Sequence, residues 1–224
     1  MIKGFVFDLD GTLLDTLDDI KDSLNRFLRN HNFALHSRES VKKMIGNGAK
    51  KLVERALPNQ NFNDEEKELF CREYIKIYET TETIQSSTRI YYGMDEVLDC
   101  LTKKNCKIAV VTNKPNNIAQ ICRKKYLKPW KINPFFGQKE NIPIKPDPFM
   151  LNKVIKLWNF DKSEVVFVGD SPEDILTAKN AGILGIGAGW GFRDIKILNE
   201  AGALCSPKTP KIFIEEIKKF GINF

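Results

Sequence analysis

The stretch FVFDLDGTLLDT at residues 5–16 decides the fold. Its opening residues, FVF, are β-branched or aromatic, a composition typical of a short strand that is buried on both faces. Two carboxylates, Asp8 and Asp10, follow at once, and the pair Gly11 and Thr12 then lets the chain turn. Each of these carboxylates raises the cost of ionising the other. Their place at the end of a buried strand therefore indicates a functional site.

Three further segments share the features of the first strand. They are short, apolar and rich in β-branched or aromatic residues, and longer helix-permissive stretches separate them. The four predicted strands cover residues 2–9, 107–112, 164–169 and 182–188. Alternation of strand and helix predicts an α/β fold, a Rossmann-like parallel sheet with right-handed crossovers.

The interval after the first strand is far longer than a crossover requires. Its segments at residues 17–33, 49–57 and 65–79 show helical periodicity. The first of these carries an apolar stripe of Leu17, Ile20, Leu24, Phe27 and Leu28. We therefore expect a small α-helical domain to be inserted into the core.

The expected division gives a core domain of residues 1–15 and 86–224 and a helical insertion of residues 16–85. The ends of the insertion, near Asp15 and at residues 86–93, are candidate hinges.

Composition narrows the classes of protein to which the chain can belong. The 224 residues are 42% hydrophobic and 29% charged, as in ordinary globular proteins, and no apolar stretch approaches the roughly 20 residues that span a bilayer. The N-terminal apolar run is short and leads straight to Asp8, so we expect a cytoplasmic protein without a membrane partner. Five scattered cysteines without a C-x-x-C pair suggest neither a disulfide framework nor a zinc site. A net charge of +6 favours anionic partners, either nucleic acid or small phosphorylated molecules.

Polar residues follow the predicted strands in order along the chain. Asp8 follows the first strand, Thr112 and Asn113 follow the second, and Asp170 follows the third, while Lys145 lies in the loop sequence PIKPDP. Taken singly, each could be a turn, a helix cap or a loop residue. Together they predict one ligand site, because ligands of open α/β sheets bind at the carboxyl ends of the strands.

With these motifs the chain resembles the haloacid dehalogenase-like superfamily of phosphohydrolases. The matching pieces are DLDGT, VTNK, IKPDP and GDSPEDI, which extend over essentially the whole length. Within that superfamily the helical insertion is similar to the smaller type of cap. Its segment MIGNGAKKLVERAL, residues 44–57, is similar to the cap segment of phosphoglycolate phosphatases. A Gly-Asn-Gly turn that opens a helix can offer N–H groups to an anion, although it can also be a plain helix start.

The resemblance implies roles for individual residues. Asp8 would attack phosphorus and form an aspartyl-phosphate, and Asp10 would serve as general acid and then as general base. Thr112 and Lys145 would complete the catalytic set. Phosphate-binding candidates are Gly11, Thr12, Thr112, Asn113 and Lys145. The candidate Mg²⁺ ligands are Asp8, the Asp10 backbone carbonyl, Asp170 and, directly or through water, Asp174. The candidate substrate contacts in the cap are Gly46, Asn47, Gly48 and Lys51.

The first functional hypothesis is therefore a Mg²⁺-dependent phosphatase for a small phosphorylated metabolite, with 2-phosphoglycolate as the leading substrate, acting as a monomer or homodimer. Asp10 counts against a dehalogenase, and a phosphosugar mutase or phosphonate hydrolase fits the motifs less well. A nucleotide, pyrophosphate or sugar-phosphate phosphatase remains an alternative. The glycine-rich segment 187–192 could bring backbone to the site or could be only a tight loop.

A hypothesis of a different class is nucleic-acid binding. It rests on the basic segment CRKKYLKPWK at residues 122–131, in which Tyr126 and Trp130 are interleaved with lysines. Lysines on the exposed face of an α/β protein usually serve solvation only, so we expect no nucleic-acid partner.

Overall fold

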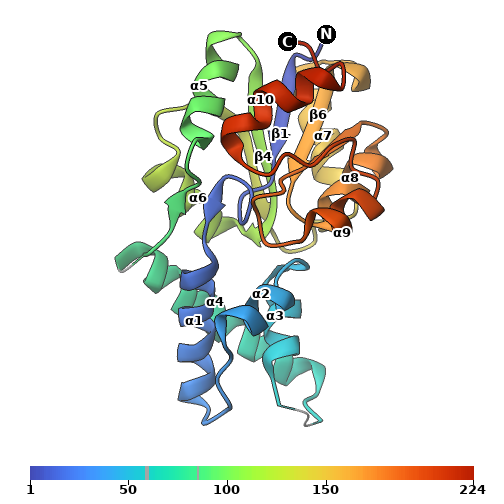
Figure 1. Cartoon of the computed structure of the whole chain (residues 1–224). Helices are drawn as coiled ribbons and strands as arrows, with labels where there is room; N and C mark the ends of the chain where they lie inside the picture. The colour runs from blue at the N-terminus through green and yellow to red at the C-terminus, as the bar shows by residue number, and fades with distance from the viewer. Residues whose placement is uncertain (59–60, 85) are drawn as a thin grey trace.

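The computed structural model describes residues 1–58, 61–84 and 86–224 (Figure 1). Its centre is a five-stranded parallel sheet with the strand order β5-β4-β1-β6-β7. The strands are β1 (Gly4–Phe7), β4 (Lys107–Pro115), β5 (Ile132–Gln138), β6 (Val165–Gly169) and β7 (Leu184–Gly187). The first strand of the chain thus lies in the middle of the sheet, and the predicted Rossmann-like α/β core is confirmed.

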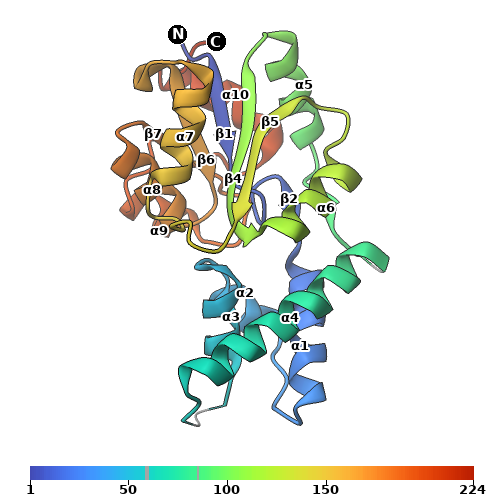
Figure 2. The ribbon, with the colours of Figure 1, turned by 180° about the vertical axis from the view of Figure 1, so that it is seen from behind.

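Helices cover both faces of this sheet (Figures 1 and 2). Phe5 and Phe7 of β1 belong to one apolar cluster, whereas Val6 belongs to a second cluster. Successive side chains of a strand point to opposite faces, so β1 is apolar throughout because both of its faces are covered. The first cluster includes residues of α5 (Met94–Lys103), α6 (Asn116–Tyr126) and α10 (Pro210–Lys219), and the second includes residues of α7 (Phe149–Trp158) and α8 (Pro172–Ala181). A short 3-10 helix, Lys162–Glu164, precedes β6, and α9 (Ile195–Glu200) follows β7.

All four predicted strands are present, as β1, β4, β6 and β7, but the sequence analysis missed β5. The sequence of β5, INPFFGQ, contains Pro134 and Gly137, two residues that weaken a strand pattern. An edge strand tolerates them because only one of its sides pairs with a neighbour, here β4.

The helical insertion lies beyond the carboxyl ends of the strands, whereas both chain termini lie at the opposite end of the sheet (Figure 1). Its helices are α1 (Leu17–Asn30), α2 (Arg38–Met44), α3 (Gly48–Ala56) and α4 (Asp64–Ile84). The predicted apolar stripe of α1 is entirely buried. Helix α2 was not foreseen, since Val41 is its one buried residue and no stripe marks it. The predicted last residue of the insertion, 85, lies outside the described residues.

No helix in the described ranges of the chain is both long enough and apolar enough to cross a membrane.

The two chain segments that join core and insertion are tied to each other. Strand β2 (Leu14–Asp15) pairs antiparallel with β3 (Arg89–Ile90), which follows the insertion. Asp19, buried in the first turn of α1, accepts hydrogen bonds from the backbone N–H of Ser87 at 2.7 Å and of Thr88 at 3.1 Å, and from the Thr88 hydroxyl at 2.7 Å. The carboxylate of Asp19 therefore holds the departing and returning segments side by side.

Candidate active site

Asp8, Thr112 and Asp170 meet at the carboxyl edge of the sheet. Asp8 follows β1, Asp170 follows β6, and Thr112 lies in the last part of β4. Because β1 pairs directly with both β4 and β6, the three strand ends lie next to one another. All three side chains line a pocket between this edge and the helical insertion, and Tyr74 and Tyr78 of α4 line its other wall. The predicted convergence of polar strand ends is therefore realised in the structure.

Three buried carboxylates form an acidic cluster in this pocket. Asp8, Asp170 and Asp174 each place one oxygen within 4.8 Å of the others. Lys145 Nζ lies 2.8 Å from Asp8 Oδ1 and 2.6 Å from Asp174 Oδ1. Burial raises the pKa of Asp8 to about 7, against the opposing effect of the Lys145 ammonium. Burial and the charges of Asp174 and Asp8 raise the pKa of Asp170 well above its ordinary value. Full ionisation of the three carboxylates therefore needs more positive charge than Lys145 alone supplies.

This cluster suits a hard divalent cation. Its donors are carboxylate oxygens, which Mg²⁺ and Ca²⁺ prefer, and a dication would offset the excess negative charge. Asp174 is already engaged by the protein: its Oδ1 accepts from Lys145, and its Oδ2 accepts from the backbone N–H of Ser171 at 3.0 Å and from the Ser171 hydroxyl at 2.6 Å. Asp8 and Asp170 consequently keep more free lone pairs for a metal than Asp174 does.

Asp10 contacts a different lysine from Asp8. Lys114 Nζ lies 2.8 Å from Asp10 Oδ1, and it also hydrogen-bonds to the hydroxyl of Tyr78. The ammonium of Lys114 further lies 4.3 Å from the centre of the Tyr78 ring, a cation–π arrangement. The two carboxylates that stand one residue apart in the sequence therefore have separate cationic partners, which lowers their mutual electrostatic cost.

The end of β4 positions both lysines. The side-chain amide of Asn113 donates from Nδ2 to the Lys145 carbonyl at 3.1 Å, and its Oδ1 accepts from the Lys145 N–H at 2.9 Å. Thr112 Oγ1 accepts a hydrogen bond from the Lys114 N–H at 3.2 Å. The side chain of Asn113 therefore orients the loop that carries Lys145, a role that the sequence analysis did not assign to it.

The glycine-rich segment 187–192 brings backbone to the site. It is therefore more than the tight loop that was its alternative interpretation. The Phe192 N–H donates to Asp170 Oδ2 at 2.7 Å. Trp190 Nε1 donates to the carbonyl of Thr12 at 2.9 Å, which joins this segment to the turn after β1. The segment thus buttresses both Asp170 and the loop that carries Asp10.

Core side chains hold the start of the Gly-Asn-Gly turn. Arg193 donates to the carbonyl of Lys42 at 2.6 Å and also to the carbonyl of Ile45. Asn47 Nδ2 donates to Glu173 Oε1 at 2.9 Å. These contacts keep this part of the insertion against the carboxyl edge of the sheet.

Two predicted phosphate-binding residues do not line the pocket. The Gly11 N–H donates to the carbonyl of Leu14 at 2.9 Å, so the turn itself uses this donor. The Thr12 hydroxyl points to Asp170 Oδ1 at 3.3 Å. Gly11 and Thr12 therefore support the loop and the acidic cluster and lie outside the pocket lining, and their contact with phosphate stays a prediction.

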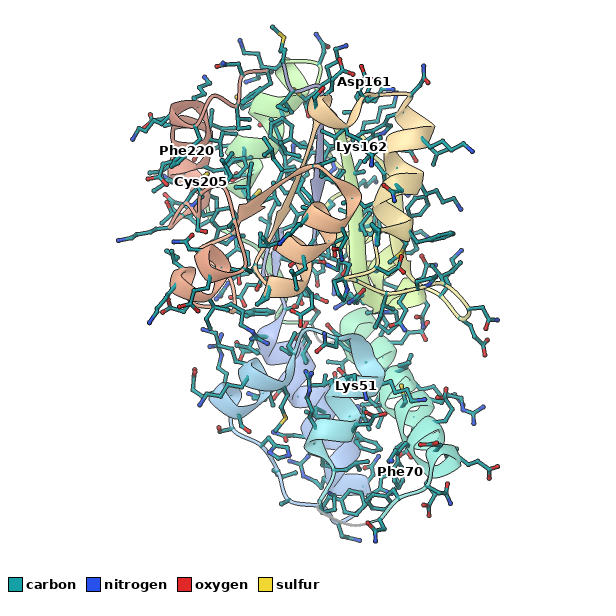
Figure 3. All side chains as sticks on the ribbon, turned by 90° about the vertical axis from the view of Figure 1, so that its right-hand side faces the viewer. Lys51, Phe70, Asp161, Lys162, Cys205 and Phe220 are labelled. Carbon is teal, nitrogen blue, oxygen red and sulfur yellow. The ribbon has the colours of Figure 1, made fainter. Side chains whose placement is uncertain are left out.

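The predicted cap contacts divide in two. Gly46 and Gly48 line the pocket. Asn47 does not line it, because its side chain bonds Glu173. Lys51 lies on α3 (Figure 3), where its 56% exposed side chain pairs with Glu54 at 2.6 Å. Asn47 and Lys51 thus have protein partners outside the pocket, and their contact with the substrate stays a prediction.

Among the pocket-lining residues that were not predicted as site residues are Lys114, Tyr74, Tyr78 and Arg193. Lys114 belongs to the VTNK motif, which was recognised without a role for its lysine. Tyr74 and Tyr78 stand four residues apart on α4, a spacing that places them on one helix face. Nothing in the sequence tells that this face turns toward Asp10, because that depends on how α4 packs against the core.

The basic segment 122–131 has its aromatic side chains engaged within the molecule. The Tyr126 hydroxyl donates to Ser86 Oγ at 2.6 Å, and Trp130 Nε1 donates to Asp99 Oδ1 at 2.7 Å. Arg123 donates to the carbonyl of Ile132 at 2.9 Å. This arrangement does not favour stacking of these rings on nucleic-acid bases.

Known proteins match the chain over most of its length. The profile of the haloacid dehalogenase-like hydrolase family matches residues 5–188. The phosphoglycolate phosphatase of Pseudomonas fluorescens is 31% identical over 95% of this chain and 76% of its own length. The phosphoglycolate phosphatase of Colwellia psychrerythraea is 32% identical over 88% of each chain. The crystal structure of a predicted phosphoglycolate phosphatase from Haemophilus somnus superimposes with a TM-score of 0.86 at 26% identity, over 96% of this chain and 98% of the other.

Proposed function

The chain belongs to the haloacid dehalogenase-like hydrolases, and we propose that it is a Mg²⁺-dependent phosphatase that converts 2-phosphoglycolate to glycolate and phosphate. The observation that carries the proposal is the separate pairing of two adjacent carboxylates, Asp8 with Lys145 and Asp10 with Lys114. Two carboxylates with different surroundings can divide the roles of nucleophile and acid/base between them. The substrate is inferred from the relatives at 31% and 32% identity, both of which are phosphoglycolate phosphatases.

In the first step, a carboxylate oxygen of Asp8 forms a bond to phosphorus while the bond from phosphorus to the ester oxygen breaks. Asp10 gives its proton to that leaving oxygen, so that glycolate departs as an alcohol. Lys145, 2.8 Å from Asp8, offsets the negative charge that the attacking carboxylate and the phosphoryl group bring together. The Thr112 hydroxyl lies in the same pocket and is placed to donate to a phosphoryl oxygen.

In the second step, water attacks the aspartyl-phosphate. Asp10, now ionised, takes a proton from the water, and the bond between phosphorus and the Asp8 oxygen breaks. Inorganic phosphate leaves, Asp8 is again a carboxylate, and Asp10 is again protonated. Each residue thus returns to its initial state after one turnover.

Mg²⁺ would be held by Asp8, by the Asp10 backbone carbonyl and by Asp170, and it would supply positive charge that offsets repulsion between the phosphate and the carboxylates. Asp174 contributes chiefly by positioning Lys145, because its oxygens accept hydrogen bonds from Lys145 and Ser171.

We assign residues 16–85 as a cap and residues 1–15 and 86–224 as the core that carries the chemistry. Support comes from the place of the insertion, because residues of α1, α3 and α4 and of the turn before α3 form the pocket wall opposite the strand ends. A cap over the strand ends excludes bulk water from the aspartyl-phosphate and contacts the part of the substrate beyond the phosphate.

A phosphate-release screen with Mg²⁺ tests the proposal. The panel contains 2-phosphoglycolate, sugar phosphates, nucleoside monophosphates and pyrophosphate, with the Asp8→Asn variant as the control for contaminating phosphatases. We expect kcat/KM for 2-phosphoglycolate to exceed the others by at least about tenfold, which is about 1.4 kcal/mol in transition-state binding. Preference for a nucleotide or a sugar phosphate would overturn the substrate, and absence of phosphate release from every ester would overturn the activity.

A further inference from the structure

The structure contains a second buried lysine at the pocket, Lys114, whose ammonium pairs with Asp10, a residue outside the acidic cluster. Its side chain is 1% exposed, and it lines the pocket together with its partners Asp10 and Tyr78. A buried ammonium is costly unless it is well paired, so its presence at a ligand site calls for a function. Lys145 already serves the Asp8 end of the site.

The position of Lys114 places it beside the leaving group. Under the proposed reaction, Asp10 hydrogen-bonds to the ester oxygen that departs. Lys114 Nζ lies 2.8 Å from Asp10 Oδ1. An ester oxygen that hydrogen-bonds to the same Oδ1 atom lies no more than about 5.6 Å from that ammonium. A negative group one or two bonds beyond the ester oxygen would therefore come within reach of Lys114.

The other groups on this side of the pocket suit a small anion. Tyr74 lines the pocket, and its hydroxyl makes no hydrogen bond to any described residue. Burial raises the pKa of Tyr74 well above its ordinary value, so its hydroxyl keeps its proton and can donate it in a hydrogen bond. A lysine ammonium and a phenol together match the oxygens of a carboxylate.

The remaining wall on the insertion side is apolar or glycine. Ile20, Ile45, Ala49 and Leu52 line it. These side chains would leave the hydroxyl groups of a sugar without hydrogen-bond partners, which disfavours sugar phosphates. The pocket therefore selects against polyhydroxylated leaving groups while it attracts an anionic one.

We propose that Lys114 is the specificity residue of the enzyme and binds a carboxylate on the leaving group, with Tyr74 as a second donor and Tyr78 as the group that holds the ammonium in place. The inference rests on the proposed phosphatase function. It adds the residues of this chain that would recognise the substrate. The substrate class is then a short phosphorylated hydroxy acid, in which the carboxylate carbon stands two bonds from the ester oxygen.

The test is a ratio of two activities of the purified full-length chain with Mg²⁺. The substrates are 2-phosphoglycolate and 2-hydroxyethyl phosphate, which has a neutral alcohol in place of the carboxylate. Removal of Lys114 also deprives Asp10 of its partner and slows both substrates, but this common loss cancels in the ratio of their kcat/KM values. For Lys114→Met we expect the ratio to fall about 10- to 100-fold, the effect of one charge-assisted hydrogen bond, mainly through KM for 2-phosphoglycolate.

Two further variants and a control variant complete the experiment. Lys114→Arg keeps the charge and should recover part of the ratio, while Tyr74→Phe should lower it several-fold and provides a second test if Lys114→Met fails to fold. Lys76→Met is the matched control, because this exposed lysine lies on α4 two residues from Tyr78. It should leave the ratio unchanged.

The outcomes separate the two proposals. A wild-type enzyme that releases phosphate equally well from both substrates would overturn the carboxylate site and leave the phosphatase intact. Equal losses on both substrates in Lys114→Met would likewise overturn it and assign Lys114 to Asp10 alone. Failure of the wild-type enzyme to release phosphate from either ester would instead overturn the proposed function.

Discussion

Gly11 lies directly against the carboxylate of Asp170. A Cβ atom built on Gly11 would be 2.3 Å from Asp170 Oδ2 and 2.6 Å from its carboxyl carbon. Gly11 also has a φ of +78°, in the left-handed region that other residues rarely adopt. The glycine after the two aspartates is therefore needed both for the turn and for the approach of a carboxylate from a strand that follows much later in the chain.

Gly11→Ala should destabilise the protein and weaken Mg²⁺ binding. Left-handed backbone costs a non-glycine residue about 1–2 kcal/mol, and the displaced Asp170 adds to this loss. Gly202→Ala is the control, since Gly202 has a φ of +99° but nothing within 4 Å of the added Cβ. Urea unfolding and titration calorimetry with Mg²⁺ should show a larger stability loss and weaker Mg²⁺ binding for Gly11→Ala alone. Equal effects on both quantities would contradict the steric argument.

Asn113→Ala should lower kcat through Lys145. Loss of the amide removes both hydrogen bonds to the Lys145 backbone and lets the ammonium drift from Asp8. Misplacement of a catalytic group by about 1 Å can cost about 100-fold, so we expect a loss of 10- to 100-fold in kcat. The control is Asn180→Ala, which removes an exposed hydrogen bond to the neighbouring Pro146 carbonyl. Steady-state kinetics that show similar small losses in both variants would refute the positioning role.

Asp8→Asn should abolish turnover and leave the fold intact. An amide oxygen is too weak a nucleophile to form the phosphorylated intermediate, while the side chain keeps its size. Asp147→Asn, which alters an exposed carboxylate in the loop after Lys145, should retain activity. Phosphate release and circular dichroism are the measurements. Retained turnover in a folded Asp8→Asn protein would eliminate Asp8 as nucleophile.

Mg²⁺ should raise the thermal stability of the wild-type protein. A ligand that binds only the folded state at 100 times its Kd stabilises it by about 2.7 kcal/mol. In Asp170→Asn the rise should be largely lost, because a buried ligand of the cluster is gone. Differential scanning fluorimetry measures the rise. KCl at the same ionic strength is the control, and it separates Mg²⁺ binding from the screening of charges by salt. An equal rise in both proteins would place the metal elsewhere.

Asp19→Ala should destabilise the junction between core and insertion. The change removes the buried carboxylate that accepts hydrogen bonds from the N–H groups of Ser87 and Thr88 and from the Thr88 hydroxyl, a loss of about 2–4 kcal/mol. Asp22→Ala on the same helix removes an exposed carboxylate and should cost about 0.5 kcal/mol or less. Urea unfolding gives both values, and hydrogen exchange at Ser87 and Thr88 should accelerate only in Asp19→Ala. A small loss for Asp19→Ala would mean that the strand pair β2 and β3 suffices to join the two parts.

The fold was predictable to the extent that its signals are local. Buried parallel strands are apolar on both faces, so β1, β4, β6 and β7 could be located from short windows of sequence. Strand β5 could not, because Pro134 and Gly137 interrupt its pattern and its edge position tolerates them. Helix α2 was missed for a related reason, since one buried valine does not make a periodic stripe.

The site was predictable where its residues follow strands and not where they come from packing. Asp8, Thr112, Asn113, Lys145 and Asp170 were named from their positions and line the pocket. Lys51 was named because it lies in the segment similar to the phosphoglycolate phosphatase cap, but such a similarity does not tell which side of the helix faces a ligand. In the structure the Lys51 side chain is exposed and pairs with Glu54.

The sequence by itself determined the α/β class, the helical insertion after β1 and the polar residues at the strand ends, because these follow from periodicity and neighbouring residues. Only the tertiary structure decided how charges pair across the pocket. Asp10 and Lys114 are 104 positions apart, and Lys114 and Tyr78 are 36 apart. Such contacts depend on how β1, β4 and α4 pack together, and the division of labour that we propose for Asp8 and Asp10 rests on that packing.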